Sequence, residues 1–67
     1  MNVEVKVVYD GILTNEGHDV NFEVESLNDC VVVTETFNDN KLTPTRIGIE
    51  SAIEKQQKLV NLGYEWV

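Results

Sequence analysis

The sequence predicts a single small α+β domain, in which one C-terminal helix packs on a three-stranded antiparallel β-meander and a short fourth strand can follow the helix (βββα or βββαβ). Two patterns support this prediction. Before Asn40, apolar and polar side chains alternate in two segments, as they do in half-buried strands, and a third segment is rich in β-branched residues. After Thr43, the apolar residues recur at the spacing of one helix face. A chain of 67 residues builds one hydrophobic core, so we expect one domain over residues 1–67.

The three strands are expected at Asn2–Tyr9, His18–Glu25 and Cys30–Phe37. Gly11 is interpreted as a bulge after the first strand, and the first chain reversal is placed at residues 15–17. The next turns are expected at 27–29 and 38–40. The residues of the first two strands that are expected to face the core are Val3, Val5, Val7, Tyr9, Val20, Phe22 and Val24.

The helix is expected to begin at Thr43, because threonine is a good N-cap and Pro44 suits the first helical position, where its missing N–H costs nothing. Its apolar face is predicted to consist of Ile49, Ala52, Ile53, Leu59 and Val60. Gly63 is expected just beyond the helix, where a left-handed residue commonly ends it. Residues 64–67 alternate again and are interpreted as a short strand or as a tail docked on a neighbour.

Residue counts limit how so small a chain can be stabilised. Cys30 is the only cysteine and His18 the only histidine, which excludes an intramolecular disulfide and a Cys/His zinc site. Small domains usually need such a supplement or a partner subunit. Val8, Val32 and Ile47 also fall on faces opposite to the expected core. We therefore expect a homo-oligomer, with a dimer as the first choice.

The N-terminus alternates valine with charged residues and does not resemble a signal peptide. No apolar run approaches the roughly 20 residues of a membrane span. Together with the single cysteine, these features predict a cytoplasmic protein without membrane contact.

Acidic residues are concentrated in the strand region. Nine of the twelve Asp and Glu residues precede Thr43, and the net charge is −7. With no basic stripe, this charge excludes direct nucleic-acid binding through phosphates. Carboxylates that point outward from strands can instead attract a basic surface of another protein; the alternative is that they only keep the chain soluble. The predicted partner-binding residues are Glu4, Glu23, Glu25, Glu35 and Trp66.

Size and composition also favour an interaction role. Short, acidic, cysteine-poor chains without a catalytic set are common among bacteriophage-encoded inhibitors of host enzymes or defence systems, which this chain resembles in size and composition alone. That likeness transfers no residue roles. We expect a non-enzymatic protein without a cofactor, possessing no catalytic residues, because the single histidine has no serine beside it in sequence.

The alternative hypothesis is a homo-oligomer that binds a small anionic ligand, such as a nucleotide. The expected helix N-terminus would present free N–H groups beside hydroxyls and a guanidinium, and aromatic residues could stack on a base. The residues of this alternative site are Thr43, Thr45, Arg46, Tyr64 and Trp66.

Three further features are interpreted as structural. The acidic and histidine side chains around the first hairpin are expected to be solvated, because their spacing does not match a calcium-binding loop; they are Asp10, Glu16, His18 and Asp19. Cys30 is expected to be an unreactive thiol, since Asp29 beside it opposes the thiolate. Gln56 lies on the apolar face of the helix and needs hydrogen-bond partners, either backbone groups at a sheet edge or the same residue across a twofold axis.

Overall fold

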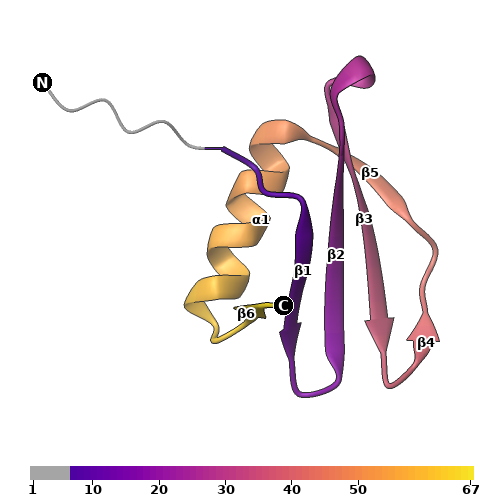
Figure 1. The fold of residues 1–67 in the computed structure, drawn as a ribbon, viewed down its shortest axis with the longest axis vertical. Helices are drawn as coiled ribbons and strands as arrows, with labels where there is room; N and C mark the ends of the chain where they lie inside the picture. The colour runs from indigo at the N-terminus through magenta and orange to yellow at the C-terminus, as the bar shows by residue number, and fades with distance from the viewer. Residues whose placement is uncertain (1–6) are drawn as a thin grey trace, which may run out of the picture.

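The structure, a computed structural model, describes residues 7–67 and consists of an antiparallel sheet with one helix packed on one of its faces (Figure 1). The predicted α+β class, with one C-terminal helix on an antiparallel sheet, is confirmed. The strands are β1 (Gly11–Asn15), β2 (His18–Glu25), β3 (Cys30–Phe37), β4 (Asn40–Lys41), β5 (Thr45–Gly48) and β6 (Glu65–Trp66). The helix α1 spans Ile49–Asn61, and a 3₁₀ turn, Ser26–Asn28, joins β2 to β3.

The sheet has the strand order β4–β3–β2–β1–β6, and β5 pairs with β3 on the side that β4 also uses. The predicted strands His18–Glu25 and Cys30–Phe37 have the bounds expected of them. The short strand after the helix is present as β6, which pairs with β1. The first reversal falls at Glu16 and Gly17, which take the positive φ angles of 45° and 83° that a tight hairpin turn requires.

The core lies between the sheet and α1. Directly opposed residues of antiparallel strands point to the same side, so Leu13 beside Val20 and Phe22 beside Val33 build one apolar layer. The buried hydrophobic residues are Leu13, Val20, Phe22, Val31, Val33, Ala52 and Leu59. Val60, which the helical spacing places on the same face, is instead 46% exposed.

The helix begins five residues later than predicted. Its N-cap is Gly48, whereas Thr43 and Pro44 lie in the loop before β5. Residues 45–48 extend because they pair with the first half of β3, and those backbone hydrogen bonds outweigh the local capping signal. Gly63 has a φ of 103° just beyond the helix end, as expected. In the part of the chain that the structure describes, no helix is long and apolar enough to cross a membrane.

The predicted first strand is also corrected. Residues 2–6 lie outside the described part of the chain, and Val7–Tyr9 form no strand. The backbone of Tyr9 is bound by the side chain of Gln56, so the sheet starts at Gly11. Val8 and Ile47, expected opposite to the core, pack against it instead.

Candidate functional site

The strand register divides the sheet into a core face toward α1 and an open face away from it. Figure 1 shows no helix over the open face among residues 7–67. Every second residue of each strand lies on this face, and the pairing of opposed residues shows which ones they are. The acidic members are Asp19, Glu23, Glu25 and Glu65, and the basic members are Lys41 and Arg46.

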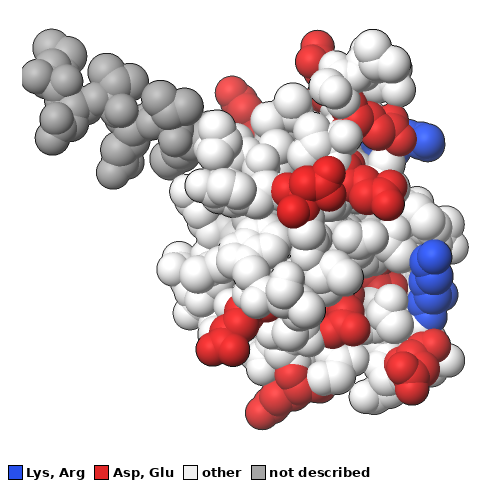
Figure 2. Space-filling model, in the orientation of Figure 1, with Lys and Arg blue, Asp and Glu red and all other residues white. Residues whose placement is uncertain are grey.

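Charge is unevenly placed across the open face. Lys41 lies on β4 and Arg46 on β5, at one side of the sheet. The acidic residues lie on β2 and on β6, toward the other side. Figure 2 shows acidic side chains spread over the face in view, with basic side chains only along the side where β4 and β5 lie.

The predicted partner-binding residues do not share one surface. Glu23 and Glu25 lie on the open face, but Glu35 is opposed to the buried Val20 and therefore lies on the core face. Trp66 lies at the β6 end of the sheet, opposed to Leu13. Glu4 is outside the described residues. The expectation that Glu35 points outward with the other glutamates is wrong.

Glu25 is held in a local polar cluster at the end of β2. It accepts hydrogen bonds from Asn28 Nδ2 (3.1 Å) and Cys30 Sγ (3.5 Å), and Arg46 lies 3.5 Å from its other oxygen. These contacts, the Asn28 hydrogen bond foremost, lower the pKa of Glu25. Desolvation, followed by the hydrogen bond to Glu25, raises the pKa of the Cys30 thiol, which agrees with an unreactive cysteine.

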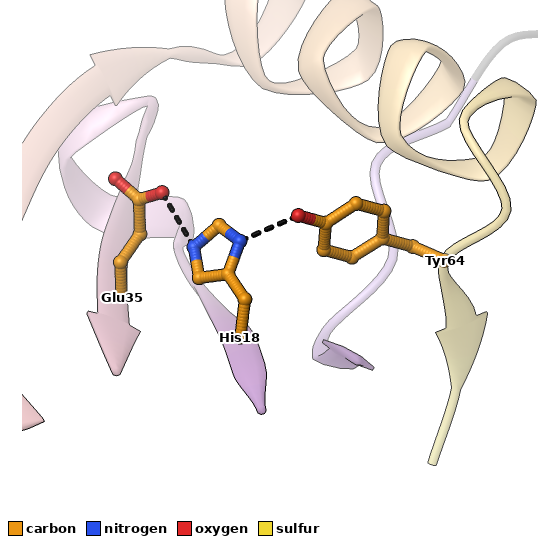
Figure 3. A network of polar contacts seen from close by, with 3 residues as sticks. All are labelled: His18, Glu35 and Tyr64. Carbon is orange, nitrogen blue, oxygen red and sulfur yellow. Dashed lines mark hydrogen bonds and ion pairs between the residues drawn. The ribbon is translucent and has the colours of Figure 1, made fainter. Parts of the chain in front are cut away.

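A second polar network joins Glu35, His18 and Tyr64 on the core side of the sheet (Figure 3). His18 Nε2 lies 3.0 Å from Glu35 Oε1, and Nδ1 lies 2.5 Å from the Tyr64 hydroxyl. A neutral ring satisfies both contacts when Nε2–H donates to the carboxylate and Nδ1 accepts from the phenol. The imidazole also stacks on Phe37, with ring centroids 4.0 Å apart. Sequence reasoning missed this network because its members are 17 and 46 residues from His18.

The order of groups in this network, a hydroxyl, an imidazole and a carboxylate, is that of a nucleophile, a base and an orienting residue. The hollow beside Glu35, which Lys55 also lines, measures about 160 Å³. Ligand pockets commonly measure about 300–1,000 Å³. We therefore interpret the network as structural: its hydrogen bonds hold the segment after α1 against β2 and β3.

An aromatic hollow lies where β1 begins and β6 ends. It measures about 350 Å³ and is lined by Tyr9, Asp10, Gly11, Trp66 and Val67. The rings of Tyr9 and Trp66 meet edge to face, with centroids 6.1 Å apart. The sequence alone grouped Tyr9 with the aromatic residues at 64 and 66 and placed Trp66 among the interaction residues, but it did not predict that the rings of Tyr9 and Trp66 meet.

The alternative anion site is not formed as predicted. Thr43 precedes β5, and Thr45 and Arg46 lie within β5, so none of them is at the helix N-terminus. Within one chain, β5 and β6 lie at opposite sides of the sheet, which separates Arg46 from Trp66. Tyr64 is engaged by His18. The prediction that residues 43–46 form the helix N-terminus is therefore wrong, and the binding of a nucleotide stays a prediction without that support.

Among residues 7–67, no group of three or more His, Cys, Asp and Glu side chains is arranged to hold a metal ion. Comparison with protein-family models, with curated proteins and with solved structures gave no match to this chain. Its fold and surface together define a small α+β protein whose sheet has one open, mainly acidic face.

Proposed function

We propose that this chain is a small non-enzymatic interaction protein that binds a basic surface of another protein through the open face of its sheet. The observation that carries the proposal is the charge on that face, where Asp19, Glu23 and Glu65 have no ion-pair partner within 4 Å among residues 7–67. Exposed carboxylates of this kind attract and orient a basic partner.

The open face has a further property that suits a protein partner. Between its charged residues lie half-buried β-branched and amide side chains, with Val32 and Thr34 on β3 and Asn21 on β2. A partner can bury Val32 and the methyl group of Thr34 favourably and can hydrogen-bond the amide of Asn21, while the charges around them set orientation. Lys41 and Arg46 give one side of the face positive charge while the other side is acidic, and this difference favours one docking orientation over its reverse.

An inhibitor that blocks the basic cleft of a host enzyme is one form that this function takes, and a cytoplasmic location and a homodimer remain predictions beside it. The unpaired Cys30 is in keeping with a reducing compartment.

Charge reversal with a matched control tests the proposal. The double variant Asp19→Lys and Glu23→Lys changes the open face, whereas Glu50→Lys and Glu54→Lys makes the same change in net charge on the exposed side of α1. Partners would be captured on each protein from the cells that produce it, at low and at moderate salt. We expect the open-face variant to lose a partner that the wild type and the helix variant retain, and the capture to weaken as salt rises. Equal capture by both variants would refute the open face as the binding surface.

A further inference from the structure

The hollow between Tyr9 and Trp66 has two aromatic walls and one acidic residue. The planes of the two rings are inclined by 73°, so they form a corner, and their side chains are 60% and 41% exposed. Asp10 and Gly11 continue the lining, and Val67 closes it at the chain end. A hollow of about 350 Å³ is large enough for one long side chain.

Contacts outside the hollow hold the backbone of Tyr9 and the ring of Trp66. Gln56 binds the N–H and the carbonyl of Tyr9 at 3.2 and 2.8 Å. Trp66 is opposed to Leu13 in the sheet, and its ring packs near Phe22, with centroids 6.2 Å apart. The backbone that carries Tyr9 and the ring of Trp66 are therefore positioned before a ligand arrives, which lowers the entropy cost of binding.

Gly11 allows the indole to approach the sheet. A Cβ on Gly11 would lie 3.2 Å from Trp66 Cζ3 and 3.3 Å from Cε3, closer than side chains normally pack. Without a side chain at this position, the Trp66 ring rests against the backbone of β1. Its exposed side is then directed to the hollow that Tyr9 and Asp10 line.

The chemistry of the lining selects the charge of the ligand. Aromatic faces carry negative electrostatic potential and attract cations within about 6 Å of the ring centroid. The Asp10 carboxylate adds a full negative charge, and the chain as a whole carries −7. A guanidinium fits such a site best, because it is planar, stacks on aromatic rings and is weakly hydrated.

We infer that the Tyr9–Trp66 hollow binds an arginine side chain of a protein partner. The inference rests on the proposed function for the source of that side chain. Trp66 is opposed to Leu13, so the anchoring position lies at the β6 edge on the core side of the sheet, and a partner on the open face would reach it around that edge. It makes Tyr9 and Asp10, neither of which the sequence predicted as a site, the residues that select the ligand.

Trp66 is the only tryptophan, so its fluorescence reports directly on the hollow. The probe is N-acetyl-arginine amide, and its control is the citrulline analogue, which has nearly the same shape but no charge. At constant ionic strength we expect arginine to change the Trp66 emission in a saturable way, with a Kd on the order of millimolar, and citrulline to leave it unchanged. Equal responses to the two compounds, or no response to either, would overturn the inference.

Three variants assign the effect to the hollow. Tyr9→Leu removes one wall but keeps the backbone that Gln56 binds, and Asp10→Asn removes the carboxylate. Each is expected to weaken arginine binding about fivefold or more, within the range of a cation–π or carboxylate contact. Glu23→Gln removes the same charge from the open face and is expected to leave the affinity unchanged. If Glu23→Gln weakens binding as much as Asp10→Asn, the response comes from the net charge of the chain and the site is refuted.

This titration needs no partner, so its outcome is separate from that of the charge-reversal experiment. Loss of arginine binding with intact capture through the open face would refute the hollow alone. Arginine binding with capture that ignores the open face would refute the proposed docking surface but not the arginine site.

Discussion

The side chain of Gln56 makes the hydrogen bonds to the Tyr9 backbone that a neighbouring strand would otherwise make. Its side chain is 4% exposed, and its amide pairs with both the N–H and the carbonyl of Tyr9. A buried amide of this kind costs free energy unless it is hydrogen-bonded, and here both of its polar atoms have a partner in the same chain. Of the two partners considered for Gln56, backbone groups are the ones found, and a twofold axis is not required.

Replacing Gln56 with leucine should therefore detach the segment before β1. The variant keeps the apolar contacts of the helix but leaves both backbone groups of Tyr9 without partners, which should lower the free energy of unfolding by about 1–3 kcal/mol. Chemical denaturation measures the loss, and amide exchange of Tyr9 should accelerate. Gln57→Leu, at the next and exposed position, should change stability by less than about 0.5 kcal/mol. Equal losses in both variants would contradict the role assigned to Gln56.

Glu25 makes part of the stability depend on pH. Its pKa is lowered in the folded protein by the hydrogen bonds from Asn28 and Cys30 and by Arg46. A carboxyl group with a lowered pKa stabilises the folded state above its unfolded pKa of about 4.3, and that contribution is lost as pH falls through the folded pKa. Wild type should therefore be more stable than Glu25→Gln at pH 7, and the difference should shrink as the pH falls toward 3. A difference that does not depend on pH would show that the carboxylate charge is not responsible.

At the scale of elements, the sequence located the second and third strands well, and it located elements poorly where local signals compete with tertiary pairing. The second and third strands have the expected bounds, and Gly63 marks the helix end. The start of the helix was misplaced because Thr43 and Pro44 form a good capping pair in isolation. On its outer side, β3 pairs with β4 only at its end, and residues 45–48 pair with its first half.

The candidate site was harder to predict than the fold for a related reason. Val31, Val32 and Val33 are consecutive, so hydrophobicity alone does not say which face of β3 each residue occupies. Glu35 has the same parity as Val31 and Val33, so its place on the core face follows only once the strand register is known. The pairing of Tyr9 with Trp66 joins residues from the two ends of the chain and has no sequence pattern.

The corrected helix start predicts how two substitutions differ. Nothing lies within 4 Å of a Cβ built on Gly48, and its φ of −67° suits any residue. Gly48→Ser adds a capping hydroxyl and restricts the unfolded chain, so it should stabilise the protein by about 0.5 kcal/mol. Thr43→Ala should have almost no effect, whereas an N-cap threonine would lose about 1 kcal/mol. Thermal unfolding of both variants compares the two helix starts, and a clear loss in Thr43→Ala would contradict the one described here.

At the scale of the whole molecule, the case for self-association has changed. Two of the three apolar residues that were expected to need a second copy, Val8 and Ile47, are covered by the chain's own core. What remains is the small number of buried side chains and the outer edge of β5, which pairs only with β3 among residues 7–67. An unpaired strand edge can pair with the same edge of another copy about a twofold axis.

We therefore predict a homodimer whose stability depends on its concentration. Because dimerisation is coupled to folding, the thermal midpoint should rise with protein concentration, and sedimentation should give twice the chain mass of 7.6 kDa. Thr45→Pro tests the edge in particular, since proline removes a backbone donor and is tolerated only at unpaired positions. The N–H groups of Thr45 and Arg46 point to opposite sides of β5, one toward β3 and one toward the outer edge. Proline at the position that bonds to β3 also destabilises the monomer, so Arg46→Pro is made beside Thr45→Pro. One of the two variants should dissociate the dimer while the chain stays folded. A midpoint that is independent of concentration, with the mass of a single chain, would instead show that this small core is sufficient by itself.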